Sequence, residues 1–241
     1  MIRQTQSRRE DREPYFKPKA PLHSYQLYRD PFTKLLIHFD GTDGATTYTA
    51  ETDQVVTFVA NAQLDTAQYK FETASLLLDG TGDYVTISDS SDWAFGTGDF
   101  TIEAWVRFNA LPSDTIAAIC SQFTGAGNYW YFGLNDTAGA KTWRFESAGT
   151  AINIQKTTTV SLNTWHHIAL VRGGNNFYIF QDGVQVGTTA TSSESIDNPA
   201  QVLVIGTVNT NYFDGWIDEL RISKGVARWT DEFTPAISAY E

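Results

Sequence analysis

Carboxylates and histidines are the side chains of this sequence that could carry out acid–base chemistry. A retaining glycosidase needs two carboxyl groups about 5 Å apart, which residues two or four apart on one face of a strand can supply. Glu103 stands alone between Thr101 and Trp105, and Asp218 and Glu219 are adjacent, so on a strand they would point to opposite faces. The sequence therefore predicts no paired-carboxylate centre, and we expect the protein not to be an enzyme.

The histidines favour a structural role over metal binding. His166 and His167 are neighbours, and neighbouring side chains of a strand point to opposite faces, so the two rings cannot chelate one ion together. His38 lies on another predicted strand and invites the same interpretation. We expect no catalytic residues among them.

Two groups of residues could bind a sugar ring. Glu103, Trp105 and Arg107 alternate along one strand and would place a flat aromatic ring among hydrogen-bonding groups. The second group begins at Asn128 and includes Tyr129 and Tyr131 beside Trp130, with Asn211, Tyr212 and Asp214 as an alternative at a loop end. Aromatic residues of a β-sandwich more often lie in the core, so both interpretations stay open.

The elements that would position these residues are short strands separated by Gly, Asp, Asn and Thr. Residues 100–108 give the clearest pattern, because apolar residues at every second position predict one face in the core. The pair Asp182-Gly183 is typical of a hairpin turn whose central residues have positive φ. Further strands are predicted at 35–39, 75–78, 84–88, 116–122, 129–134, 143–146, 165–172, 177–181, 184–188, 201–205 and 215–222.

About a dozen short strands predict an all-β fold, a two-sheet antiparallel jelly-roll sandwich over residues 35–241. Aromatic residues make up 14% of the chain and charged residues 19%, which indicates a globular protein. Cys120 is the single cysteine, so the chain has no internal disulfide and stability must come from packing. No apolar segment approaches the ~20 residues that span a bilayer, and the first residues lack the apolar region of a secretory signal.

Residues 1–34 differ from the rest and predict an extended N-terminal arm. They contain four prolines, and they carry eight Lys and Arg against four Asp and Glu, whereas residues 35–241 carry nine against 24. The acidic body excludes nonspecific binding of nucleic acid. Aromatic side chains of the arm are suited to anchoring it in grooves of a partner; they are Tyr15, Phe16, Tyr25 and Tyr28.

Four ordered segments resemble the laminin-G-like, concanavalin A-like lectin and glucanase jelly roll. They are Phe-Gly-Thr-Gly-Asp-Phe-Thr-Ile-Glu-Ala-Trp-Val (95–106), Asn-Thr-Trp-His-His-Ile-Ala-Leu-Val-Arg (163–172), Phe-Tyr-Ile-Phe-Gln-Asp-Gly-Val-Gln-Val-Gly (177–187) and Phe-Asp-Gly-Trp-Ile-Asp-Glu-Leu-Arg-Ile-Ser (213–223). The resemblance covers residues 35–241. Three more segments, at 35–44, 74–84 and 222–235, look like versions of this module in phage structural and tail-associated proteins.

The same resemblance implies a structural calcium ion. Glucanase relatives hold calcium with an Asp of the final strand and with carbonyl groups near the first strand and an early Gly turn. Carried onto this sequence, the ligands would be Asp218, Gly80 and Asp40. The alternative is that Asp40, Asp79 and Asp218 only cap turns.

The resemblance and the arm together predict a virion accessory protein, as a capsid decoration, head fibre or tail-associated component. It would be made in the host cytoplasm, bind a capsid or tail protein through the arm, and display a carbohydrate-binding jelly roll toward a host surface glycan. The alternatives are a bacterial cell-surface or secreted lectin-like module and a degraded glycoside hydrolase. Whether the sandwich forms a homo-oligomer is left open by the sequence.

Overall fold

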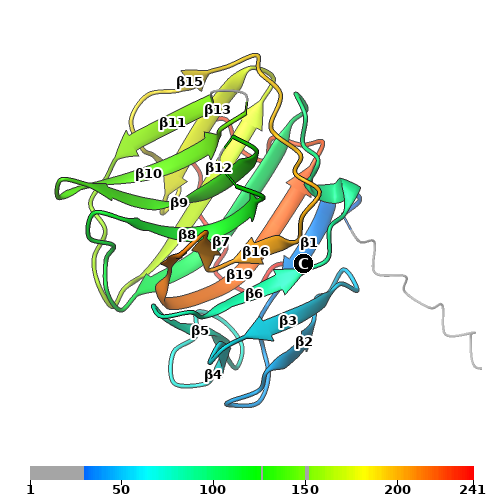
Figure 1. Ribbon diagram of the computed structural model, residues 1–241, viewed down its shortest axis with the longest axis vertical. Helices are drawn as coiled ribbons and strands as arrows, with labels where there is room; N and C mark the ends of the chain where they lie inside the picture. The colour runs from blue at the N-terminus through cyan, green and yellow to red at the C-terminus, as the bar shows by residue number, and fades with distance from the viewer. Residues whose placement is uncertain (1–29, 126, 150–151) are drawn as a thin grey trace, which may run out of the picture.

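The computed structural model describes residues 30–125, 127–149 and 152–241, and these form two antiparallel sheets packed face to face (Figure 1). Strand β7, Phe100–Phe108, shows how the sequence produces this arrangement. Its alternate residues Phe100, Ile102 and Val106 are fully buried in the core between the sheets. The period of two predicted for this strand is confirmed, and so is the all-β jelly-roll sandwich.

The first sheet, called sheet A, has nine strands. Its central path runs in the order β14-β13-β12-β7-β19-β5-β4, while β1 pairs with β19 and β15 pairs with β13. The bounds are Thr33–Ile37 for β1, Gln63–Asp65 for β4, Ser75–Asp79 for β5, Trp165–Gly173 for β12, Asn176–Gln181 for β13, Val184–Gln185 for β14, Ala190–Thr191 for β15 and Asp214–Lys224 for β19.

The second sheet, called sheet B, has eight strands in the order β11-β10-β9-β8-β16-β6-β3-β2. A two-stranded hairpin, β17–β18, follows β16, and the turn η1 is 3₁₀-helical. The bounds are Thr47–Thr49 for β2, Val55–Val59 for β3, Tyr84–Ile87 for β6, Ile116–Phe123 for β8, Tyr129–Thr137 for β9, Ala140–Ser147 for β10, Ile152–Thr157 for β11, Leu203–Ile205 for β16, Thr207–Val208 for β17, Asn211–Tyr212 for β18 and Ser91–Trp93 for η1.

Large aromatic side chains fill the space between the sheets. Trp93, Trp130 and Trp143 are fully buried, and the ring of Phe95 stacks on Phe100 with centroids 4.4 Å apart. Such rings bury large apolar areas and pack in offset or edge arrangements, so they supply much of the core energy. No helix among the described residues is long and apolar enough to cross a membrane.

The predicted strands are found, with shifted ends, and several others were missed, among them β3 with five residues and β11 with six. The missed strands include β2 and β4, which have three residues each, too few to show a period in the sequence. The turn at Asp182-Gly183 has φ of 53° and 80°, as predicted for a hairpin of this type. Strand β1 begins at Thr33, so the sandwich starts slightly before the predicted boundary of the arm.

Candidate functional site

A hollow of about 280 Å³ lies on the outer face of sheet B, between β8, β9, β10 and the hairpin β17–β18. Aromatic and charged side chains from the strands and two amides from the hairpin line it: Phe123, Tyr129, Tyr131, Arg144, Glu146, Asn209 and Asn211. Two larger hollows, over β2–β3 and beside residues 191–194, lack this combination. The first is lined by Thr, Val, Tyr and Phe only, and the second by short polar residues and one Glu.

The alternation of β9 and β10 places these side chains. Trp130 and Phe132 of β9 point into the core, so Tyr129 and Tyr131 point outward. On β10, Trp143 and Phe145 point into the core. Arg144 and Glu146 alternate with them and therefore point outward.

The pairing of β9 with β10 sets the charged residues beside Tyr131. Glu146 is directly opposite Tyr131, and Arg144 is opposite Gly133. Because Gly133 has no side chain, nothing from that position stands between Arg144 and the Tyr131 ring, whose centroid is 5.8 Å from the guanidinium carbon. An added Cβ at Gly133 would lie 2.4 Å from the Ala117 carbonyl oxygen, so the close approach of β8 also requires glycine.

Arg144 and Glu146 form an ion pair that is part of a small polar network. A terminal guanidinium nitrogen of Arg144 lies 2.6 Å from Glu146 Oε2. The Tyr129 hydroxyl donates a hydrogen bond of 3.0 Å to Glu146 Oε1, and Arg144 Nε donates one of 3.1 Å to Asn153 Oδ1. Both charged side chains are about one-fifth exposed, so they remain reachable from solvent while their geometry is fixed.

The Tyr131 hydroxyl is the unusual atom of the site. The residue is 2% exposed, and its buried hydroxyl meets the full geometry of a hydrogen bond with no described residue, although the Glu146 carboxylate lies close enough to add to the rise of its pKa. Burial raises the pKa of Tyr131 well above its ordinary value, so the group stays a neutral donor and acceptor at physiological pH. Buried polar groups almost always have a partner, so an unpartnered hydroxyl lining a hollow points to a ligand group.

The structure brings together only part of the residues predicted to bind a ligand. Tyr129 and Tyr131 lie in the hollow with ring centroids 6.3 Å apart and planes 21° from parallel. Asn128 precedes β9 and accepts two hydrogen bonds from Thr124 through its backbone carbonyl. Arg144 and Glu146 were missed, although their alternation with Trp143 and Phe145 was visible in the sequence.

The structure leaves little of the predicted sugar-binding face at Glu103, Trp105 and Arg107 open to a ligand. These residues lie on β7, in sheet A, on the opposite side of the sandwich from Tyr129 and Tyr131. Glu103 is 1% exposed and Trp105 6%, because the C-terminal segment, residues 226–240, returns across this face. Arg107 remains partly exposed, and its guanidinium group donates to Gln68 and Asn163.

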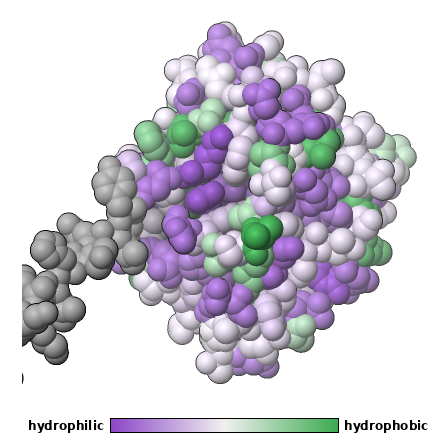
Figure 2. All heavy atoms as spheres, turned by 180° about the vertical axis from the view of Figure 1, so that it is seen from behind, coloured by the Kyte–Doolittle hydropathy of each residue, from purple (hydrophilic) through white to green (hydrophobic). Residues whose placement is uncertain are grey.

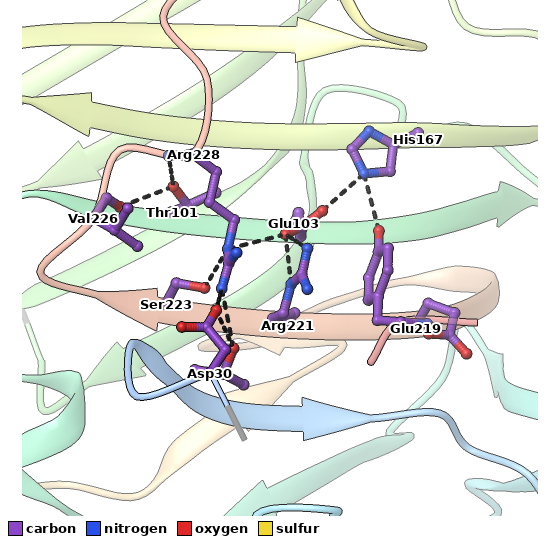
Figure 3. Close-up of polar contacts among 11 residues, drawn as sticks. Asp30, Thr101, Glu103, His167, Glu219, Arg221, Ser223, Val226 and Arg228 are labelled. Atoms are coloured by element: carbon purple, nitrogen blue, oxygen red, sulfur yellow. Dashed lines mark hydrogen bonds and ion pairs between the residues drawn. The ribbon is translucent and has the colours of Figure 1, made fainter. Parts of the chain in front are cut away.

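Under the C-terminal segment, Glu103 is the centre of a buried ionic network (Figure 3). Arg221 Nε donates to Glu103 Oε1 at 2.8 Å, and His167 Nε2 lies 3.2 Å from Glu103 Oε2 and 3.0 Å from the Tyr240 hydroxyl. Burial alone would raise the pKa of Glu103, but His167 and Arg221 outweigh it and hold the pKa below the ordinary value. Arg228 extends the network to Asp30.

From behind, the molecule shows hydrophilic residues with small, separate groups of apolar ones (Figure 2). Within the described residues the C-terminal segment itself packs onto sheet A through stacked Trp229 and Phe233, whose ring centroids are 3.9 Å apart. Phe233 also meets the ring of buried Phe180 edge-on. This face is therefore a packed part of the fold and not an open groove.

The sequence predicted that Asp218 and Glu219 point to opposite faces of a strand. The structure differs from this prediction. A β-bulge interrupts the register of β19 between Asp218 and Arg221, and Glu219 has φ of 50°. Asp218 accepts hydrogen bonds from the backbone N–H groups of Lys70, Phe71 and Glu219. Both carboxylates are fully buried and bonded, so neither is placed to act on a substrate.

The histidines have carboxylate partners, which agrees with a structural role. His38 Nδ1 lies 2.8 Å from Glu219 Oε1, and this hydrogen bond raises the pKa of His38. His166 Nδ1 lies 2.7 Å from Asp182 Oδ2 at the hairpin turn. The fold, and not sequence spacing, brings Asp182 to His166, so the sequence alone does not indicate this pair.

The residues predicted to bind calcium do not form one site. Asp40 Oδ1 accepts bonds from Thr73 and Ala74, just before β5, whereas Gly80 follows β5 and packs against Asp214. Five strand residues, about 17 Å, separate the two ends of β5. Asp218 is bonded to the same loop as Asp40 but not to Gly80. The residues described contain no group of three acidic, His or Cys side chains suited to a metal, and calcium binding stays a prediction.

The predicted partner-binding residues of the arm lie outside the described residues; they are Tyr15, Phe16, Tyr25 and Tyr28. The described chain starts at Asp30, whose carboxylate pairs with Arg228 and accepts a hydrogen bond from Thr33. Asp30, which we call the root of the arm, is therefore bound to the C-terminal segment on the outer side of sheet A. The hollow is on the other side of the sandwich.

Solved structures with the same fold are known, at low sequence identity. Domain 4 of AbnA, an extracellular arabinanase from Geobacillus stearothermophilus solved with arabinotriose, is 15% identical with a TM-score of 0.61, over 81% of this chain and 93% of that domain. The botulinum neurotoxin serotype D binding domain is 13% identical with a TM-score of 0.59, over 81% of this chain. The present chain covers only 48% of that toxin domain.

One further solved structure and one family model also match the chain. A mutant sialidase of Trypanosoma rangeli, an enzyme, also matches, at 14% identity and a TM-score of 0.56, over 81% of this chain and 31% of that one. No curated protein sequence matches significantly. The model of the concanavalin A-like lectin/glucanases superfamily matches residues 79–231, more than half of the chain. With two jelly-roll sheets and this match, the protein belongs to the concanavalin A-like lectin/glucanases superfamily.

Proposed function

We propose that the protein is a non-enzymatic glycan-binding module and that the glycan binds in the hollow on sheet B. The observation that carries the proposal is the buried, unpartnered Tyr131 hydroxyl beside the Arg144–Glu146 pair. Small-molecule sites combine apolar walls with a few convergent polar groups, and Phe123 and Tyr129 supply the aromatic part. Glu103, Asp218 and Glu219 of sheet A, in contrast, are buried and hydrogen-bonded, which favours binding over catalysis.

Neighbours in the comparison support this proposal. The arabinanase domain was solved in complex with arabinotriose, and the entry of botulinum neurotoxin type C depends on interaction with two ganglioside molecules. Several of the similar structures are binding domains of larger proteins. These ligands belong to those proteins, and they support sugar recognition as a use of this fold.

A glycan array followed by calorimetry tests the proposal. We expect the chain to bind at least one class of oligosaccharide, and Tyr131→Phe to weaken that binding by about tenfold, the value of one hydrogen bond to a ligand. Tyr178→Phe, the same change on sheet A, is the matched control and should bind like the wild type. Absence of binding to every glycan would contradict the proposal, as would an equal loss in both variants.

We further propose that the sandwich is displayed on a virion, with residues 1–29 bound to a capsid or tail protein. A basic segment joined to an acidic body suits docking onto an acidic assembly, and the root of the arm is fastened on the side opposite the hollow. An anchored arm would therefore leave the hollow facing outward. The alternative is a bacterial cell-surface or secreted lectin-like module.

Sedimentation with phage particles separates these alternatives. We expect the full chain to sediment with particles and a chain lacking residues 1–29 to remain folded but stay in the supernatant. The deletion stops before Asp30, so it spares the ion pair with Arg228. Sedimentation of the shortened chain at full occupancy would place the docking surface on the sandwich, and failure of both chains to sediment would favour the lectin-like alternative.

A further inference from the structure

We infer that the hollow on sheet B selects a neutral sugar and binds two adjacent hydroxyl groups of it through Arg144 and Glu146. This inference rests on the proposed glycan-binding function and adds the chemical class of the ligand. It depends on three features of the hollow: its balanced charge, the geometry of its polar groups and its size.

The charge of the hollow is balanced internally. Arg144 and Glu146 are its charged lining residues within the described chain, and their side chains are 2.6 Å apart. A carboxylate of an acidic sugar that accepted from the remaining N–H groups of Arg144 would lie close to the Glu146 carboxylate, and the two negative charges would repel each other. Desolvating an unpaired charge is costly, and residues 35–241 carry nine Lys and Arg against 24 Asp and Glu, so their field also repels anions. A neutral ligand incurs neither cost.

The ion pair offers a donor and an acceptor side by side. Arg144 and Glu146 are two apart on β10 and point to the same face. Asn153 and Glu146 fix the guanidinium group from two sides, which leaves further N–H groups of its five for a ligand oxygen. One sugar hydroxyl can accept from Arg144 while its neighbour donates to Glu146. The buried Tyr131 hydroxyl adds a third contact that needs no charge on the ligand.

The apolar wall and the volume suit a small part of a glycan. The rings of Phe123 and Tyr129 are partly exposed, with centroids 5.2 Å apart and planes at 42°, and they can cover the C–H face of a sugar ring. The hollow of about 280 Å³ is slightly smaller than the range of about 300–1,000 Å³ for ligand pockets. We therefore expect one or two sugar rings in the hollow.

Glu146→Gln tests the role of charge balance. Glutamine keeps the shape and an acceptor for the Tyr129 hydroxyl, but it leaves the positive charge of Arg144 uncompensated. The probes are a neutral panel of arabino-, gluco-, galacto- and manno-oligosaccharides and an acidic panel of sialyllactose and oligogalacturonates. Glu232→Gln, an exposed site on the C-terminal segment, is the matched control, and circular dichroism checks that each variant is folded.

We expect the wild type to bind a member of the neutral panel at least about tenfold more tightly than any acidic member. Glu146→Gln should weaken the binding of that neutral ligand about tenfold and strengthen the binding of acidic members. Glu232→Gln should change neither affinity. Tighter wild-type binding of acidic members, lost in Tyr131→Phe, would overturn this inference and leave the proposed function intact. Binding to neither panel would overturn both.

Discussion

At the scale of a single residue, the buried Tyr131 hydroxyl is expected to lower the stability of the fold. A buried hydroxyl without a hydrogen bond costs about 1–3 kcal/mol, whereas phenylalanine at this position would avoid that cost. The Phe variant used in the binding test is therefore expected to be at least as stable as the wild type. Loss of binding without loss of stability would separate a ligand-binding role of this hydroxyl from a structural one.

His38 gives a pH-dependent contribution to stability whose sign follows from its partner. The hydrogen bond to Glu219 raises the pKa of His38 in the folded state above the value of about 6.5 in the unfolded state. The stabilisation is therefore fully present below about pH 6.5 and is lost as pH rises through the folded-state pKa.

Denaturant unfolding of wild type and His38→Gln between pH 5 and pH 9 tests this prediction. The wild type should exceed the variant in free energy of unfolding at the acidic end, and the difference should shrink toward the alkaline end. His166→Gln, which changes a histidine bonded to Asp182 at a partly exposed turn, serves for comparison. A difference between wild type and His38→Gln that stays constant with pH would show that the Glu219 contact does not depend on the proton.

Residue-level predictions from sequence succeeded where alternation alone decides the outcome. Tyr129 and Tyr131 lie outside the core because Trp130 and Phe132 occupy it. The same alternation places Glu103 and Trp105 outside the core, but it cannot tell whether that face meets solvent or another segment. The C-terminal segment covers it, through contacts as distant in sequence as Glu103 and Arg221. The bulge at Asp218 was equally invisible, because the sequence shows no turn signal there.

At the level of elements, the C-terminal segment is the part that has no regular structure but holds several strands together. Tyr240 contacts His167 through its hydroxyl and Glu219 through its backbone N–H, and Arg228 contacts Thr101 and Ser223. These bonds join β7, β12 and β19. The segment thus substitutes for a further layer of structure over sheet A.

Ending the chain at Gly225 should lower the free energy of unfolding by more than about 3 kcal/mol, because Glu103 loses Arg228 and its buried surroundings. Trp105 and Phe180 would also be exposed. Urea unfolding measures the change. Ile237→Ala, at a side chain 89% exposed, should leave stability within about 0.5 kcal/mol. An unchanged urea midpoint of unfolding in the shortened chain would contradict this prediction, because it would show that the segment does not stabilise the sandwich.

At the level of the whole molecule, the two faces of the sandwich have different roles. Sheet A faces the C-terminal segment and the root of the arm, and sheet B presents the hollow. The sequence predicted the sandwich because its strands alternate and its turns carry Gly and Asp. It could not predict which face is covered, since that depends on where the last residues of the chain return.

The central claim is the position of the ligand, and a crystal structure with the tightest-binding oligosaccharide tests it most directly. We predict sugar hydroxyls within hydrogen-bond distance of the Tyr131 hydroxyl, the Arg144 guanidinium group and the Glu146 carboxylate, with no metal ion between protein and sugar. Density for the sugar on the sheet A side, or at the loops near Asp40 and Gly80, would contradict this account.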